Sequence, residues 1–261
     1  MHPFLNIANS AARSAGNMIV RSLERLDVLK MTEKGQNDFV TEVDQKSEKI
    51  IIDAIRKNYP HHAILAEESG ELSGGNDEIV WIIDPLDGTT NFIHGFPHFC
   101  ISIAVKYKGR VEHGLICDPV RQETFTASRG AGAQLNNRRI RVSAQANLKG
   151  ALLGTGFPYR EGQNFDAYIR NLQTLMPQVS GIRRAGSAAL DLAYIAAGRL
   201  DGFWEYNLAP WDIAAGSLMV LEAGGMVSDT QGGENYLDSG NIIAGNLKIF
   251  KAMLQCLHSN N

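Results

Sequence analysis

Cysteine is scarce in this chain of 261 residues, which contains only Cys100, Cys117 and Cys256. The three are far apart and odd in number, and no two of them form a Cys-x-x-Cys pair. The sequence therefore argues against a disulfide framework and against a thiolate zinc site, and it favours a reducing compartment.

Long apolar runs and a basic surplus are also missing. No stretch approaches the length of a membrane span, and the first residues lack the basic and apolar segments of a signal peptide. Lysine and arginine together number 25, against 28 aspartates and glutamates, which argues against general coating of nucleic acid. We expect a cytoplasmic protein that neither enters a membrane nor binds nucleic acid directly.

The composition is that of an ordinary folded protein. Hydrophobic residues make up 44% and charged residues 20%, so the chain can bury a core without disulfides or structural metal. At about 150 residues per domain, the length allows one large domain or two small ones. No repeat, low-complexity tract or composition break marks a linker. We predict a single domain over 1–261 with two packed halves, roughly 1–145 and 146–261.

Periodicity and capping residues predict the elements of the first half. Apolar residues at helical spacing predict a helix over 7–19. A second helix is expected to begin at Thr41, with Asp44 as its capping acid, and to stop before Pro60. The polar stretch 30–38 between them is expected to be an exposed loop. Short buried strands that end in acidic residues are expected at 63–66 and 80–83.

The rest of the chain changes character twice. An antiparallel meander is predicted from strand-like segments at 100–107, 110–117, 123–128 and 138–142. Helices and strands then alternate, with helices expected at 166–175, 187–197, 212–223 and from 247 onward. The strands of this part are expected at 151–154, 202–206, 226–228 and 242–244. The pattern as a whole predicts a mixed α/β fold.

The most informative run is 84–91, with the sequence Asp-Pro-Leu-Asp-Gly-Thr-Thr-Asn, directly after a predicted buried strand. Asp84 leaves the strand end, where α/β folds bind ligands, and Asp87 returns a second carboxylate to the same place. Gly88 lets a ligand approach the backbone closely. Thr89 is expected to begin a helix whose free N–H groups can bind an anion.

Paired carboxylates at a strand end indicate a bound cation. Two of them a few ångströms apart repel by about 4 kcal/mol at an effective dielectric near 20. Oxygen ligands without histidine or cysteine favour Mg²⁺ over Zn²⁺. Asp-Pro and Asp-Gly also occur as plain turn residues, but a run of this length after a strand disfavours that interpretation. Metal ligands beside an anion pocket indicate an enzyme that acts on phosphate esters.

The run 84–91 is also the first signature of the inositol monophosphatase family, which the chain resembles over essentially its whole length. The second signature, Trp-Asp-x-Ala-Ala-Gly, is present at 211–216. Further matching segments are 38–44, 67–70, 186–189 and 222–225. The opening residues 2–8 and the short C-terminus resemble a bacterial branch of the family whose members have been implicated in transcription complexes.

This resemblance has implications for the fold and for the metal ligands. It implies a five-layered αβαβα sandwich of the inositol monophosphatase and fructose bisphosphatase type, a single catalytic domain, a homodimer, and inhibition by Li⁺. Two to three Mg²⁺ ions per site are implied. The first would bind Glu67, Asp84 and the Leu86 carbonyl, and the second would bind Asp84, Asp87 and Asp212. A weaker third ion would bind Glu67 and water.

The resemblance also implies roles in substrate binding and catalysis. The main-chain N–H groups of Gly88 and Thr89 would bind phosphate. Asp44 and Thr89 would polarise the attacking water, with Glu67 close by. The alcohol side of the substrate would contact Gly186, Ser187, Ala188, Glu205 and Asp212. Glu205 would accept hydrogen bonds from the hydroxyl groups of inositol or a sugar.

Several of these residues have simpler interpretations when each is taken alone. Asp44 fits a capping acid, Asp212 fits the N-cap of the helix that it opens, and Glu205 fits an exposed strand position. His94 and His98 are four residues apart, but Gly95 and Pro97 between them oppose a ligand-bearing helix, so packing roles are favoured. The segment 154–156 lacks the full Gly-x-Gly-x-x-Gly pattern of nucleotide-binding loops.

The motifs predict a Mg²⁺-dependent phosphomonoesterase that works by direct attack of water, and the resemblance implies that its substrate is myo-inositol monophosphate. A close alternative is a phosphatase of the same superfamily for histidinol phosphate or another small phosphate ester. An alternative from another class is a non-catalytic partner of RNA polymerase or antitermination complexes. Its surface would lie around Arg183 and Arg184 or the basic segment 138–141, although 138–141 also fits a solvated face and the arginine pair also fits a loop or subunit contact.

Overall fold

The computed structural model describes residues 2–28, 31–35, 38–158 and 165–258. Its helices are α1 (Pro3–Ser22), α2 (Glu42–Asn58), α3 (Thr89–Ile93), α4 (Phe165–Leu175), α5 (Ala188–Ala196), α6 (Pro210–Glu222), α7 (Tyr236–Ser239) and α8 (Leu247–His258), with short 3₁₀ helices η1 (Leu23–Val28) and η2 (Met176–Gln178). The helices predicted over 166–175, 187–197 and 212–223 are confirmed, with ends that differ by one or two residues. None of the described helices has the length and apolarity that crossing a membrane requires.

The larger sheet has the strand order β10-β9-β8-β7-β6-β5-β3-β4. Its strands are β3 (His62–Ala66), β4 (Gly70–Leu72), β5 (Asn76–Asp87), β6 (Cys100–Tyr107), β7 (Arg110–Asp118), β8 (Glu123–Ser128), β9 (Gly132–Leu135) and β10 (Arg138–Arg139). Neighbours from β5 to β10 pair antiparallel, which confirms the predicted meander, whereas β3 and β5 are parallel. The strand expected at 138–142 is wrong beyond Arg139, because only two residues of that segment pair with β9.

The smaller sheet has the order β12-β11-β13-β15-β14. Its strands are β11 (Leu152–Thr155), β12 (Gly181–Arg183), β13 (Gly202–Glu205), β14 (Met226–Ser228) and β15 (Ile242–Gly245). β11 is parallel to both of its neighbours, whereas β15 is antiparallel to β13 and β14. The carboxyl ends of β11 and β13 therefore lie side by side at one edge.

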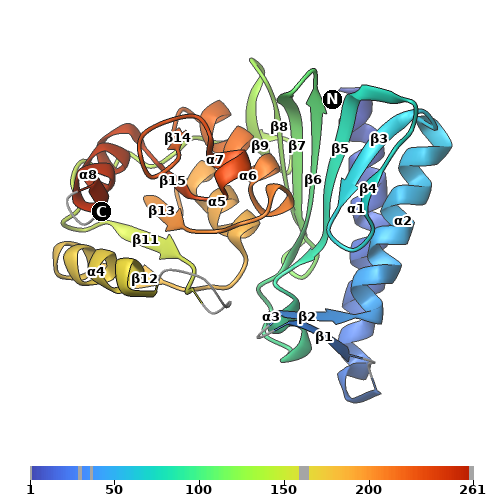
Figure 1. The fold of residues 1–261 in the computed structure, drawn as a ribbon, viewed down its shortest axis with the longest axis horizontal. Coiled ribbons are helices and arrows are strands. Elements are labelled where there is room, and N and C mark those ends of the chain that lie inside the picture. The colour runs from blue at the N-terminus through green and yellow to red at the C-terminus, as the bar shows by residue number, and fades with distance from the viewer. Residues whose placement is uncertain (1, 29–30, 36–37, 159–164, 259–261) are drawn as a thin grey trace.

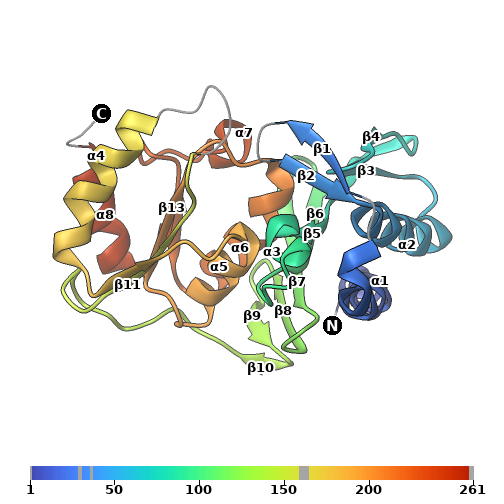
Figure 2. The same ribbon diagram turned by 90° about the horizontal axis from the view of Figure 1, so that it is seen from below.

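The helices and the two sheets alternate in five layers (Figures 1 and 2). α1 and α2 cover one face of the larger sheet, α5 and α6 lie between the two sheets, and α4 and α8 cover the far face of the smaller sheet. Three clusters of buried apolar side chains fill the spaces between these layers. The predicted αβαβα sandwich is confirmed.

The two outer helices of the larger sheet follow directly from their sequences. The alanines predicted to face a neighbouring element on α1 are buried, including Ala8, Ala12 and Ala15. α2 begins with a capping box, in which Thr41 accepts from the backbone and the Asp44 side chain accepts from the N–H of Thr41. This capped start is confirmed, and the helix ends before Pro60 as expected.

The prediction of an exposed loop at 30–38 is wrong for the residues that the structure describes. Residues Met31–Gly35 form strand β1, which pairs antiparallel with β2 (Asp38–Thr41); residues 29–30 and 36–37 lie outside the described part. Strand pairing here satisfies the backbone of a polar segment that carries no apolar alternation, so composition alone suggested a loop. β2 lies beside α3 (Figure 1), which places this hairpin next to the site described below.

Candidate functional site

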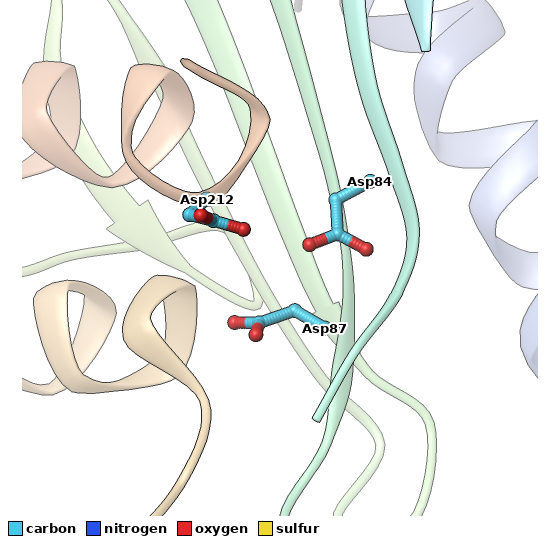
Figure 3. A group of neighbouring side chains, drawn as sticks. All are labelled: Asp84, Asp87 and Asp212. Atoms are coloured by element: carbon cyan, nitrogen blue, oxygen red, sulfur yellow. The ribbon is translucent and has the colours of Figure 1, made fainter. Parts of the chain in front are cut away.

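Three carboxylates converge between the larger sheet and the central helices (Figure 3). Asp84 and Asp87 belong to the end of β5, and Asp212 belongs to the first turn of α6. One oxygen from each residue lies within 4.8 Å of those from the other two. We call these three residues the acidic cluster.

A bulge in β5 explains how Asp84 and Asp87 come to the same place. Residues three apart on a regular strand point to opposite faces of the sheet. Here Asp84 is opposite Ser102 of β6 and Asp87 is opposite Cys100, so β5 carries one extra residue between the two pairs. The extra residue reverses the alternation and turns both carboxylates to one side.

Hydrogen bonds hold the bulge. The Leu86 N–H donates to Oδ1 of Asp84 at 2.9 Å, and the Ser47 hydroxyl of α2 donates to the Pro85 carbonyl at 2.7 Å. Pro85 suits this position because it has no N–H to leave unpaired where the ladder is interrupted. The local sequence Asp-Pro-Leu-Asp is therefore matched to the distorted backbone.

The acidic cluster is electrostatically unfavourable on its own. Burial, followed by the charges of Glu67, Asp87 and Asp212, raises the pKa of Asp84 well above its ordinary value. Burial raises the pKa of Asp87 to about 6. Burial, with the charges of Asp87 and Glu67, likewise raises the pKa of Asp212. Such a set of oxygen donors suits a hard divalent cation, whose charge would offset the repulsion.

The start of α5 orients Asp87. Its Oδ2 accepts hydrogen bonds from the Ser187 hydroxyl at 2.6 Å and from the Ala189 N–H at 2.8 Å. The Cys100 thiol lies 3.9 Å from the same oxygen. Ser187 is also the N-cap of α5, so one serine both starts the helix and holds the carboxylate.

A hydrogen bond joins Asp44 and Thr89. The Thr89 hydroxyl lies 2.8 Å from Oδ1 of Asp44, to which it donates, and 3.1 Å from the Leu86 carbonyl. Oδ2 of Asp44 accepts from the N–H and the hydroxyl of Thr41. Burial raises the pKa of Asp44, and the hydrogen bonds from Thr41 and Thr89 oppose this shift. Asp44 is thus both the capping acid of α2 and the partner of Thr89.

Gly88 allows the chain to turn from β5 into α3. Its φ of +97° lies in the left-handed region, and a Cβ there would come within 3.0 Å of the His98 carbonyl and 3.2 Å of the Gly186 carbonyl. Only glycine fits both the conformation and the space. The helix that the sequence predicts at Thr89 is confirmed, although it has only five residues.

One cavity of about 170 Å³ collects nearly all of the predicted site residues. Those that line it are Glu67, Asp84, Leu86, Asp87, Gly88, Thr89, Gly186, Ser187, Ala188, Glu205 and Asp212. Asp44 does not line the cavity, but it accepts a hydrogen bond from Thr89, which does. The positions therefore come together from the residue after β3, from β5, α3, β13 and α6, and from the start of α5.

Asp212 differs in detail from the expected N-cap. α6 begins at Pro210, so Asp212 is its third residue, and its Oδ2 accepts from the N–H of Ala209 at 2.7 Å. The helix starts earlier because proline fits the first helical position, where no N–H partner is needed. Asp212 caps the helix from inside with one oxygen and is also a member of the acidic cluster.

Sequence reasoning missed several residues of the cavity wall. Gly156 and Phe157 line it beside Glu205. Arg184 lines it as well, whereas the sequence suggested a partner surface, a loop contact or a subunit contact for this arginine. Arg184 lies over the Phe157 ring, 5.8 Å from its centroid. The sequence around Gly156 suggested only an incomplete nucleotide loop, and its neighbourhood with Glu205 depends on the pairing of β11 with β13.

Comparisons with known proteins agree with this geometry. The profile of the inositol monophosphatase family matches residues 1–260. The chain is 60% identical over 258 residues to a Pseudomonas aeruginosa protein named Nus factor SuhB, covering 97% of this chain and 95% of that protein. The bacterial branch indicated by the opening residues is therefore the SuhB branch.

Solved structures show the same similarity. The extragenic suppressor protein suhB from Bartonella henselae has 46% identity and a TM-score of 0.97, with 100% of both chains covered. An inositol monophosphatase from Anabaena has 38% identity and a TM-score of 0.84, with 99% of this chain and 96% of that chain covered. This chain belongs to the inositol monophosphatase family.

Proposed function

We propose that this protein is a Mg²⁺-dependent phosphomonoesterase that converts myo-inositol monophosphate to inositol and phosphate. The observation that carries the proposal is the acidic cluster, three carboxylates with oxygens within 4.8 Å of one another, in a cavity that also contains Gly88 and Thr89 at the start of α3. Cation ligands and anion-binding N–H groups side by side suit a phosphate ester.

The residues fit the proposed metal. Glu67, Asp84 and the Leu86 carbonyl would hold one Mg²⁺, and Asp84, Asp87 and Asp212 would hold a second. Glu67 and water would hold a weaker third. The donors are all oxygens, and their mutual repulsion in a buried place favours a bound cation. When bound, the ions supply positive charge to the attacking water and to the leaving oxygen.

The chain's own groups position the other reactants. The main-chain N–H groups of Gly88 and Thr89 would bind the phosphate. The Thr89 hydroxyl, which donates to Asp44, can accept a hydrogen bond from the attacking water and direct its lone pair at phosphorus. Burial raises the pKa of Asp44, which suits a carboxylate that receives a proton from the water through Thr89.

The other side of the cavity would hold the alcohol. Glu205 would accept hydrogen bonds from its hydroxyl groups, and the segment 186–188 would contact the ring, with Asp212 near the leaving oxygen. These positions are drawn from three separate elements that line one cavity. We further propose that Li⁺ inhibits the enzyme by replacing one Mg²⁺.

The test is phosphate release by the purified protein from a panel of esters, with Mg²⁺ or with a chelator. We expect Mg²⁺-dependent release, fastest from myo-inositol monophosphate and inhibited by Li⁺. Faster turnover of histidinol phosphate would contradict the proposed substrate but support the proposed reaction. If no ester releases phosphate in the presence of Mg²⁺, the proposal that this protein is a phosphatase is refuted.

A second candidate function is favoured by the relatives. The Pseudomonas aeruginosa protein with 60% identity is named a Nus factor. We propose that this cytoplasmic protein, as a homodimer, also joins RNA polymerase or antitermination complexes through a surface away from the cavity. Affinity capture of the wild type and of Asp87→Asn tests this: recovery of transcription proteins by both supports it, and recovery by neither removes it.

A further inference from the structure

Gly156 and Glu205 lie opposite each other at the ends of two parallel strands. β11 and β13 are neighbours whose pairing ends with Thr155 opposite Trp204; Gly156 directly follows β11, and Glu205 is the last residue of β13. The Glu205 carboxylate lies across the Gly156 backbone. A Cβ built on Gly156 would overlap Oε1, Cδ and Oε2 of Glu205, which are the three atoms nearest to it.

The glycine is not required by its own backbone. Its φ lies outside the left-handed region, so an alanine could adopt the same conformation. The three atoms nearest to a Cβ at 156 all belong to the Glu205 carboxylate, and it is this group that leaves no room for a side chain. The missing Cβ therefore creates the space in which that carboxylate rests.

The neighbours of Gly156 hold this wall of the cavity in place. Thr155 is buried, and its hydroxyl lies 3.2 Å from the Tyr168 hydroxyl of α4. The Phe157 ring packs edge-on against Tyr168, with centroids 5.7 Å apart. Because the backbone is anchored on both sides, a side chain added at 156 would displace the end of Glu205 rather than the strand.

We propose that Gly156 is a positioning residue for Glu205 and thereby determines which alcohols the cavity accepts. The inference rests on the proposed function. Without a side chain at 156, Glu205 lies against β11 and leaves room for a polyol whose hydroxyls donate to it. With alanine, the carboxylate is displaced from β11 and loses its alignment with the hydroxyls of the polyol. Esters of alcohols without ring hydroxyls lose little.

The test compares Gly156→Ala with the wild type on myo-inositol 1-phosphate and on p-nitrophenyl phosphate. For the inositol ester we expect KM to rise about tenfold while kcat stays within about threefold. For the aryl ester both constants stay within about twofold. The melting temperature is expected to change little, because the end of a flexible side chain moves.

A second background isolates the contact. In Glu205→Ala the three atoms that a Cβ at 156 would overlap are gone. Adding Gly156→Ala to this variant is therefore expected to change its KM for the inositol ester by less than about twofold. Gly154→Ala, two residues earlier on β11, is a matched control. Its Cβ would meet Leu200 and Phe203 at 3.1 and 3.2 Å, so it is expected to lower stability without discriminating between the two esters.

Three results would overturn the inference: an unchanged KM in Gly156→Ala, an equal loss for both esters, or the same loss in the Glu205→Ala background. A wild type that releases no phosphate from any ester refutes the proposed function instead. In that case a crystal structure of Gly156→Ala still decides the contact. A displaced Glu205 supports the positioning role, and an unmoved one overturns it.

Discussion

The Ser187 hydroxyl donates a 2.6 Å hydrogen bond to Oδ2 of Asp87, although the two residues are 100 positions apart in the chain. The bond joins the start of α5 in the central helix layer to the end of β5 in the larger sheet. Because the same oxygen also accepts from the Ala189 N–H, α5 determines the direction of one carboxylate of the acidic cluster.

Ser187→Ala should weaken the binding of Mg²⁺ without removing it. The variant loses one hydrogen bond to Asp87 and keeps the one from Ala189, so we expect the apparent affinity for Mg²⁺ to fall about tenfold. The measurement is the rise in melting temperature during a Mg²⁺ titration. Ser217→Ala is the control, because this equally buried hydroxyl donates to the Ile213 carbonyl inside α6. Equal affinities in Ser187→Ala and the wild type would contradict the orienting role.

Asp87→Asn should stabilise the metal-free protein at pH 7.5. Burial raises the pKa of Asp87 to about 6, so its contribution to stability is present below the ordinary value of 3.8 and is lost as the pH rises through 6. Removal of the charge should therefore raise the melting temperature in chelator by about 2–5 °C. The rate of phosphate release should fall at least about a hundredfold. Mg²⁺ should raise the melting temperature of the variant by less than it raises that of the wild type.

The control for this variant is Asp53→Asn, which removes an exposed aspartate of α2. It should leave both the melting temperature and the response to Mg²⁺ unchanged. If Asp87→Asn melts lower than the wild type in chelator, the charge is not a source of repulsion in the metal-free state.

Much of the fold is predictable where the signal is local. The capping box of Thr41 and Asp44 lies within four residues, and it is present as expected. β6 and β14 have the predicted bounds, because each is a short apolar run between turn residues. The hairpin of β1 and β2 is missed, since polar strands without alternation resemble loops until their pairing is known.

The candidate site shows the same division. Family signatures name the residues of the acidic cluster, but not how they converge. Asp84 and Asp87 are three apart and would face opposite sides of a regular strand; the bulge against β6 reverses this, and no local pattern reports it. The closeness of Gly156 and Glu205 depends on the order of strands in the sheet, which the periodicity of one sequence does not contain.

Gly216→Ala should destabilise the fold through the contact between α5 and α6. A Cβ on Gly216 would lie 2.5 Å from Cβ and 2.7 Å from Cδ1 of Leu192, in a fully packed layer. We expect a loss of about 1–3 kcal/mol in the free energy of unfolding, measured in urea. This close approach gives the last glycine of the 211–216 signature a packing role.

Leu192→Gly supplies the matched background for that test, because it removes the Cβ as well as the Cδ1 that a side chain at 216 would meet. The added methyl group of Gly216→Ala then enters vacant space, so the double variant should be more stable than the sum of the single losses by at least about 1 kcal/mol. Strictly additive losses would show that Leu192 is not what excludes a side chain at 216.

Acid should destabilise the protein through His98. This imidazole is 6% exposed, its Nε2 has no hydrogen-bond partner among the described residues, and its ring lies edge-on to Tyr194 at 5.9 Å. Burial, followed by the charge of Arg121, lowers the pKa of His98 to about 4. The unfolded chain takes up a proton near pH 6.5 and the folded chain does not, so stability is lost as the pH falls from 6.5 toward 4.

Between pH 7.5 and pH 5 this difference corresponds to about 2 kcal/mol in the free energy of unfolding. His98→Gln should remove that share of the pH dependence, as measured by urea unfolding in chelator at both values. His61→Gln, at an exposed position, is the control and should keep it. A His98→Gln protein with the same loss between pH 7.5 and 5 as the wild type would mean that this buried ring does not resist protonation, and that other groups cause the acid sensitivity.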